Sequence, residues 1–203
     1  MSPMLKYTAY QPRAGSRLHH PPKNLSNHLV RIRRLTQLET GIIRDHLLRL
    51  DRKSRELRFG HAVSDAYLEK HASEIFEHRS LVKGCFVDGI CRGVGEAFFT
   101  DDDRGEVEAA FSVEARWQGH GLGTLIFQRL LRAVQNRGAN TVCVLCMRSN
   151  DPMIRIAEKL DGAINVMPDG VTGEILPNPA NGFLSFQAEM MEEMQWMQME
   201  LPD

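Results

Sequence analysis

Three glycines at alternate positions give the first indication of chemistry in this chain. In "QGHGLG", residues 118–123, Gly119, Gly121 and Gly123 lead directly into an apolar-periodic segment. Glycines at the point where a loop opens a helix let backbone N–H groups approach a phosphate closely. Two well-known phosphate loops are excluded, because G-x-G-x-x-G needs a glycine where Thr124 stands and the loop of nucleotide hydrolases needs a lysine. The spacing therefore indicates an anion held in a different way.

A C-x-x-C pair, Cys143 and Cys146, has the spacing of a metal site. The pair lies in "NTVCVLCM", which is typical of a buried strand, and positions three apart on a strand point to opposite faces. The two sulfurs therefore cannot easily share one ion. We interpret them, with Cys85 and Cys91, as small buried hydrophobes of a reducing compartment, and we predict no metal site.

Length and composition predict one domain with appendages. The chain has 203 residues, of which 42% are hydrophobic and 25% are charged, and this is enough for a substantial core. Lysine and arginine number 25 against 26 acids, which gives a formal net charge of -1. Because the chain has no overall positive charge, we predict that it binds neither nucleic acid nor an anionic membrane. No apolar run approaches the length of a membrane span and no signal pattern is present, which predicts a cytoplasmic protein.

The first predicted strand follows an N-terminal leader. Residues 1–29 carry several prolines and no sustained period, which is typical of a flexible segment. "VRIRRL" then alternates as a short strand. Thr36 and Glu39 can form a capping box that opens a helix, and helical spacing continues through residues 41–59. A second helical segment begins at Ser64.

From residue 81 the hydrophobic period changes to two. "LVKGCFV" and "ICRGVGEAFF" flank Asp88-Gly89, a pair suited to the positive φ angles of a type I′ turn. "EVEAAFSV" follows as a third strand, so that the three predict an antiparallel meander. Because side chains alternate along a strand, one face of the third strand is more polar than the other, and it carries Glu106, Glu108, Ala110 and Ser112.

A helix and further strands are predicted after the glycine loop. The helix has an apolar stripe and ends at Gly138. "NTVCVLCM" is apolar on both faces, as expected of a central strand parallel to the one before the helix. Asp151 and Pro152 then open another helix, which ends at Asp161-Gly162. "AINVM" and "VTGEIL" predict a last hairpin.

The C-terminal segment, residues 179–203, predicts an amphipathic, Met-rich helix. Its apolar side chains recur at spacings of three and four, namely Phe183, Phe186, Met190, Met194, Met197 and Leu201. This seam suits a partner, a second subunit in a homodimer, or the chain's own domain, and periodicity does not distinguish among them.

These features together resemble the GNAT superfamily of acyl-CoA-dependent N-acyltransferases. In that family an R/Q-x-x-G-x-G/A loop wraps the CoA pyrophosphate, and residues 118–123 match it. "SNDPMIRIAEKLDG" is similar to the next family motif. The resemblance covers about residues 30–176 and implies an α/β (α+β) fold: a mixed, mostly antiparallel sheet with a central, splayed parallel strand pair and flanking helices. We place the domain at residues 30–178, between the leader and the C-terminal helix.

A narrower resemblance is to the GNAT module of bacterial protein-lysine acetyltransferases. "HLLRLDRKSRELRFG" followed by "VSD" is similar to the start of that module. "VEAAFSVEARWQGHGLG" is similar to its acid-bearing strand and loop. No nucleotide-binding regulatory domain or CoA-ligase-like domain accompanies the module in this sequence.

The resemblance implies acetyl-CoA as co-substrate. Backbone amides of the loop would hold its two phosphates at a helix N-terminus, from the residues Gln118, Gly119, His120, Gly121, Leu122, Gly123 and Thr124. The pantetheine amides would pair with the strand residues Phe111, Ser112 and Val113. Asn150 would hydrogen-bond pantetheine, with plain helix N-capping as its alternative.

The implied reaction is the direct attack of an amine on a thioester. An ammonium with a pKa near 10.4 is not nucleophilic, so a base must remove its proton. Glu108 is the candidate base, acting through a water, and Glu96 is the alternate. Ala157 stands where similar enzymes commonly hold a tyrosine that protonates the leaving thiolate. The proton for the leaving thiolate would then come from Ser149 or a water, or the reaction would have no dedicated acid. A route through an acylated Cys146 is also possible, but the sequence shows no histidine paired with it.

The sequence therefore predicts an N-acetyltransferase for a protein lysine or a small-molecule amine. The alternative is a catalytically weak, CoA-sensing GNAT module that acts through a protein partner. A domain that binds no CoA is the third hypothesis.

Overall fold

The computed structural model describes most of the predicted domain. The described residues are 25, 27–100, 105–160, 162–167, 170–175, 187, 189–191 and 194. The predicted leader, residues 1–29, and the predicted C-terminal helix, residues 179–203, therefore lie mostly outside the described residues. No described helix is both long and apolar enough to cross a membrane.

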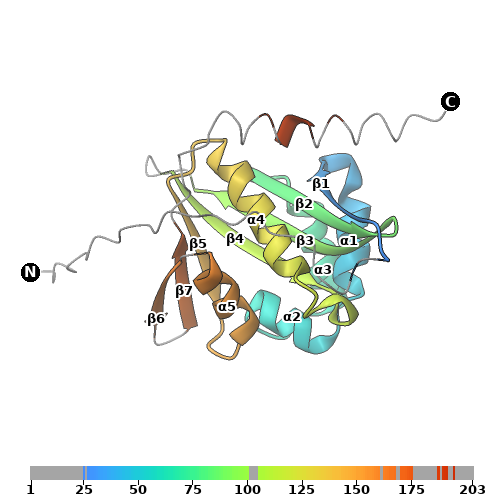
Figure 1. The fold of residues 1–203 in the computed structure, drawn as a ribbon. Helices are drawn as coiled ribbons and strands as arrows, with labels where there is room; N and C mark the ends of the chain where they lie inside the picture. The colour runs from blue at the N-terminus through green and yellow to red at the C-terminus, as the bar shows by residue number, and fades with distance from the viewer. Residues whose placement is uncertain are drawn as a thin grey trace, which may run out of the picture.

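One seven-stranded sheet organises the domain, with the strand order β1-β2-β3-β4-β5-β7-β6 (Figure 1). All neighbouring strands are antiparallel except β4 and β5, which are parallel. The predicted α/β class, meander and β-loop-α-β unit are thereby confirmed. The strands are β1 Val30–Leu35, β2 Ser80–Val87, β3 Ile90–Phe99, β4 Glu106–Val113, β5 Thr141–Cys146, β6 Ala163–Met167 and β7 Gly170–Ile175.

Helices cover both faces of this sheet. The helices α1 and α3 pack on Val82 and Val94 of one face, whereas α4 and α5 pack on Ala97, Ala109 and Val142 of the other face. Figure 1 shows α4 crossing the strands on its side of the sheet. The helices are α1 Thr40–Leu48, α2 Arg52–Phe59, α3 Asp65–Glu74, α4 Leu122–Gln135 and α5 Asp151–Lys159, with short 3₁₀ turns η1 Gln37–Glu39 and η2 Ala115–Trp117.

Local sequence signals account for several of these boundaries. The capping box at Thr36 and Glu39 is present and opens η1, which runs into α1. Asp88 and Gly89 have φ angles of 51° and 82°, as a type I′ hairpin requires. The single helix predicted through residues 41–59 is wrong, because Asp51 accepts a hydrogen bond from the Ser54 amide and starts α2 as a separate helix.

The described part of the C-terminal segment contacts the chain's own domain. Residues 187, 189–191 and 194 are helical, and Glu189 is buried. Its carboxylate accepts a hydrogen bond of 2.7 Å from Asn136 Nδ2 and one of 3.2 Å from Arg137 Nη1. It also lies 3.4 Å from Lys83 Nζ. At this point, therefore, the segment packs on α4 and β2.

The closest packing between the sheet and α4 predicts a large effect of one methyl group. A Cβ atom at Gly95 would lie 2.6 Å from Ile126 Cγ2, so that Gly95→Ala forces the helix away from β3. We expect the free energy of unfolding to fall by about 1–3 kcal/mol, measured by urea denaturation followed by circular dichroism.

Gly41→Ala is the matched control, because a Cβ atom there meets nothing within 4 Å. Alanine is the better helix former, so this variant should gain up to about 1 kcal/mol. Equal stabilities of the two variants would contradict the close packing of α4 on β3.

Candidate active site

The pairing between β4 and β5 stops after three residue pairs. The register places Glu106 opposite Thr141, Val107 opposite Val142 and Glu108 opposite Cys143, and then the strands diverge. Beyond this point β4 continues to pair with β3, and β5 continues to pair with β7. Backbone groups on the facing edges, residues 109–113 and 144–146, therefore have no ladder partner among the described strands. We name this region the β4–β5 gap.

The glycine loop lies directly after the diverging half of β4. Gly119 and Gly121 have φ angles of 76° and 84°, a conformation that glycine adopts without strain. Helix α4 begins at Leu122, and the Leu125 amide donates to the Gly121 carbonyl at 3.0 Å, which is the first hydrogen bond of the helix. The amides before Leu125 thus have no acceptor within the helix, and the N-terminus of a helix carries partial positive charge. This arrangement can hold an anion.

The side chain of Gln118 closes the loop. Its Nε2 donates one hydrogen bond to the Val113 carbonyl, at 2.8 Å, and another to Ser54 Oγ of α2, at 3.0 Å. The loop is thus tied both to the end of β4 and to a helix that precedes it by more than sixty residues. Ser54 was not predicted as a site residue, because no local pattern links it to the loop.

Asn150 connects the start of α5 to the same helix. Its Oδ1 accepts a hydrogen bond from the Met153 amide at 3.3 Å, so that Asn150 is the N-cap of α5. Its Nδ2 donates to the Leu57 carbonyl of α2 at 3.4 Å. The capping alternative raised by the sequence is therefore present, and the contact with pantetheine stays a prediction.

Four of the other predicted cofactor residues have buried side chains and can act only through their backbones. Val113, Leu122 and Thr124 are buried, and the Ser112 hydroxyl lies 2.9 Å from His46 Nε2. The Phe111 ring packs on Phe127, while the Nδ1 atom of the half-buried His120 has no hydrogen-bond partner among the described residues.

Glu108, the predicted base, is exposed on the face of the sheet that carries α1 to α3. It belongs to the last residue pair before the gap, beside Cys143 of β5. Glu174 of β7 lies on the other side of Cys143. Among the residues that the structure describes, no lysine or arginine forms an ion pair with the Glu108 carboxylate.

Glu96, the alternate base, is fully buried and already has two partners. Its Oε2 accepts hydrogen bonds from Arg58 Nη2 at 2.6 Å and from His71 Nε2 at 2.8 Å. Burial by itself would raise the pKa of Glu96, but the charge of Arg58 and the hydrogen bond from His71 outweigh it and lower the pKa.

The cysteines of β5 are held as thiols. Burial, a hydrogen bond to Glu106 at 3.3 Å and the nearby carboxylates raise the pKa of Cys143 to about 12. Burial also raises the pKa of Cys146. Because the thiolate is the nucleophilic form, neither side chain is prepared for attack at neutral pH.

A second buried carboxylate, Glu114, lies between β4 and the glycine loop. It accepts hydrogen bonds from Arg49 Nε at 2.7 Å and Arg92 Nη1 at 2.8 Å, and His46 Nδ1 lies 3.6 Å away. Burial opposes ionisation, but His46, Arg49 and Arg92 prevail and lower the pKa of Glu114 to about 2. Burial lowers the pKa of His46 in spite of this carboxylate. None of these contacts was predicted.

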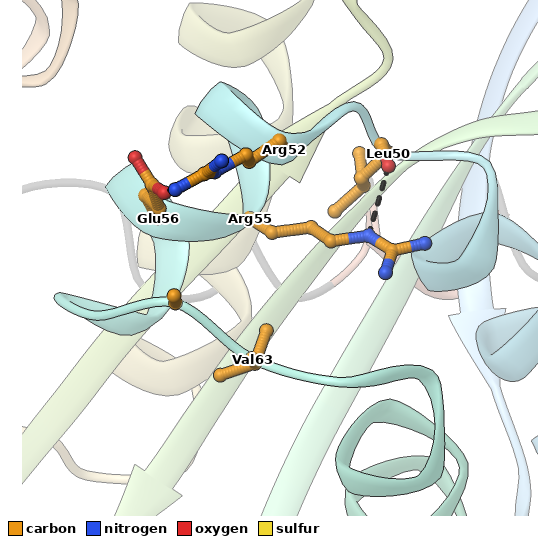
Figure 2. Close-up of a pocket in the computed structure, with 6 residues that line it drawn as sticks. Leu50, Arg52, Arg55, Glu56 and Val63 are labelled. Carbon is orange, nitrogen blue, oxygen red and sulfur yellow. Dashed lines mark hydrogen bonds and ion pairs between the residues drawn. The ribbon is translucent and has the colours of Figure 1, made fainter.

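A pocket of about 300 Å³ lies on the other side of α2. Figure 2 shows Arg55 crossing it to reach the Leu50 carbonyl at 2.9 Å. Each helical residue turns by about 100°, so the pocket side chains of α2 face away from those at positions 54, 57 and 58. The pocket is therefore separate from the β4–β5 gap. It is lined by Leu50, Arg52, Arg55, Glu56, Ala62 and Val63.

Among the described residues, no group of three or more His, Cys, Asp or Glu side chains could hold a metal ion.

Comparisons with known proteins agree with this geometry. A family model described as "Acetyltransferase (GNAT) family" matches residues 45–162. A search of curated proteins found no match.

Solved structures of low sequence identity share the fold. The GNAT domain of S. lividans PAT has a TM-score of 0.63 at 15% identity, covering 72% of this chain and 90% of that chain. PaiA N-acetyltransferase from Thermoplasma acidophilum, in complex with coenzyme A, has a TM-score of 0.56 at 13% identity, covering 73% and 99%. YncA, a putative acetyltransferase from Salmonella typhimurium with its cofactor acetyl-CoA, has a TM-score of 0.55 at 16% identity, covering 74% and 95%.

The lowered pKa of Glu114 predicts a specific acid sensitivity. Because its pKa falls from 4.5 to about 2 on folding, its contribution to stability is complete above pH 4.5 and is lost as the pH falls toward 2. Between pH 5 and pH 3 the wild type should lose about 2 kcal/mol of unfolding free energy from this group. Glu114→Gln should be less stable at pH 7 and lose correspondingly less over that interval, as measured by urea denaturation.

Glu77→Gln, which alters an exposed carboxyl in the turn that follows α3, should follow the pH dependence of the wild type. If Glu114→Gln also follows the wild type, the buried ion-pair network does not stabilise the fold in this way.

Proposed function

Because the chain belongs to the GNAT family of acyl-CoA-dependent N-acetyltransferases, we propose that it transfers the acetyl group of acetyl-CoA to a primary amine. The amine would belong to a protein lysine or to a small molecule. The observation that carries this proposal is the glycine loop at the N-terminus of α4, placed directly after a strand that has lost its parallel partner.

The residues of the loop fit a pyrophosphate. A side chain added at Gly119 would meet nothing within 4 Å, so that open space lies over the loop backbone. The amides of Leu122, Gly123 and Thr124 precede the first hydrogen bond within α4 and can donate to phosphate oxygens, whereas the Gln118 amide already donates to the Ala115 carbonyl at 3.2 Å. In this proposal Gln118, Gly119, His120, Gly121, Leu122, Gly123 and Thr124 hold the phosphates, while Phe111, Ser112, Val113 and Asn150 hold pantetheine.

Glu108 is the base in this proposal. A base must have a lone pair that no cation occupies and must reach the entering amine, directly or through one water. Glu108 meets the first condition, because it is exposed and has no ion-pair partner among the described lysines and arginines. Glu96 is the weaker candidate, because Arg58 and His71 bind it and lower its pKa.

Direct attack of the amine is favoured over an acylated cysteine. The pKa of Cys143 is raised to about 12 and that of Cys146 is also raised, so that both remain thiols at neutral pH. The amine, once Glu108 has accepted its proton, would then attack the thioester carbonyl, and the thiolate of CoA would leave.

The alanine at position 157, where similar enzymes commonly hold a tyrosine, favours one alternative function. Ala157 is buried and packs against Gly173 of β7, where an added Cβ would come within 3.3 Å of it. No hydroxyl is therefore supplied from this position to the leaving thiolate. A catalytically weak, CoA-sensing module is the second candidate function, and it predicts CoA binding without amine-dependent CoA release.

Replacing the proposed base should separate chemistry from binding. We expect Glu108→Gln to lower kcat by about 100-fold or more, because general-base catalysis typically contributes this much. The affinity for CoA should change less than threefold. Thiol release from acetyl-CoA, measured with a panel of polyamines, aminoglycosides and lysine peptides, gives kcat, and calorimetry with CoA gives the affinity.

Glu106→Gln, two residues earlier on the same face of β4, is the matched control and should retain activity within about threefold. Equal losses in the two variants would remove Glu108 as base. Absence of thiol release by the wild type with every amine, together with CoA binding, would favour the sensing module.

A single methyl group in the loop should obstruct the cofactor. Gly119 and Gly138 both have positive φ angles, 76° and 85°, and an added Cβ meets nothing within 4 Å at either position. Backbone strain should therefore lower the free energy of unfolding of both alanine variants by a similar amount, about 1 kcal/mol. Only Gly119→Ala should raise the Kd for CoA, by about tenfold or more, because its methyl group enters the space proposed for the pyrophosphate.

The Kd is measured by calorimetry and the strain by thermal melting. Equal CoA affinities of the two variants would place the phosphate elsewhere.

A further inference from the structure

Helix α2 binds side chains from both sides of the β4–β5 gap. Gln118, which follows β4, donates to Ser54 Oγ, and Asn150, which follows β5, donates to the Leu57 carbonyl. One turn further along, Arg58 binds Glu96 of β3. Figure 1 shows α2 between α5 and the loop that enters α4. Helix α2 therefore links the chain segments that leave the two diverging strands, β4 and β5.

The contact between Ser54 and Gln118 is the one that reaches the glycine loop. Ser54 is 8% exposed, and its backbone amide donates to the Asp51 carboxylate at 2.7 Å, which holds the first turn of α2 in place. Gln118 uses its Nε2 hydrogens on two acceptors, Ser54 Oγ and the Val113 carbonyl. Without the hydroxyl of Ser54, one of these hydrogens loses its acceptor, and the side chain is held by the Val113 carbonyl alone.

The next residues of the loop depend on this orientation. Gly119 follows Gln118 directly, and its left-handed conformation turns the chain toward the N-terminus of α4. Because the Gln118 side chain ties the loop to both Val113 and Ser54, loss of the tie to Ser54 would let the backbone torsion angles at Gln118 change, and this would move the loop amides relative to one another. Backbone amides bind a phosphate well only when they converge on it.

We propose that Ser54 is a positioning residue for acyl-CoA, acting through Gln118. This inference rests on the proposed function, because it assigns Ser54 to the loop that would hold the CoA pyrophosphate. Ser54 does not take part in proton transfer, since Glu108 lies on β4 at the other end of the gap. Its removal should therefore weaken the binding of CoA and leave the chemical step unchanged.

The test is a double-mutant cycle on CoA affinity. Ser54→Ala should raise the Kd for CoA and the KM for acetyl-CoA about five- to tenfold, as the loss of one hydrogen bond implies. Its kcat at saturating acetyl-CoA should stay within twofold of the wild type. Gln118→Met, which keeps the length of the side chain without amide hydrogens, probes the contact from the other side. Calorimetry gives each Kd, and thermal melting confirms that each variant is folded.

In the double variant the two losses should not add, because both remove the same contact. Ser73→Ala is the control, since the Ser73 hydroxyl is exposed and donates to the Lys70 carbonyl of its own helix. It should bind CoA as the wild type does.

Three outcomes would overturn the inference while leaving the proposed function intact. These are wild-type affinity in Ser54→Ala, fully additive losses in the double variant, or a fall in kcat at unchanged Kd. If the wild type itself does not bind CoA, the proposed function fails and the inference fails with it.

Discussion

The early end of the β4–β5 pairing is the constraint on which the site depends. Beyond Glu108 and Cys143, backbone groups of the two strands face each other without forming a ladder. The other edges are held by β3 and β7, so that the two strands cannot close on each other without breaking those pairings. Residues that are distant in sequence, such as Leu57 and Asn150, meet at one end of this opening because α2 joins the segments that leave it. An acyl-CoA chain that pairs with the free edge of β4 would satisfy the same backbone groups.

Burial of charge divides the carboxylates near this opening into two kinds. An ionised carboxylate inside a protein costs several kcal/mol unless a cation accompanies it. Glu96 has Arg58, and Glu114 has Arg49 and Arg92, and both carboxyl groups have lowered pKa values. These pairings stabilise the face of the sheet under α1 to α3, and they also make the two groups poor proton acceptors. Glu108 is exposed and needs no such partner, and this is why it is the base in the proposed function.

Local signals were predictable from the sequence, and contacts between distant segments were not. The capping box at Thr36, the turn at Asp88 and the glycine loop before α4 each depend on a few adjacent residues, and the structure contains all three. The break between α1 and α2 was missed because the helical period runs on through it, although Asp51 is a good N-cap. The bond between Ser54 and Gln118 joins positions 64 residues apart, and neither hydrophobic period nor motif spacing encodes it.

The packing of α5 on β7 limits how the leaving group can be treated. Ala157 is buried and lies against Gly173, where an added Cβ would come within 3.3 Å of the Ala157 Cβ, so the helix approaches the strand too closely for a tyrosine ring. A thiol is more acidic than an alkylammonium ion, as the reference pKa values near 8.5 for cysteine and 10.4 for lysine show, so CoA can leave as a thiolate and take its proton from water. An amine with a pKa near 10.4 has no such freedom, because it must lose its proton before it can attack. Of the two proton transfers, the one at the amine is therefore the one for which the protein has to provide a group.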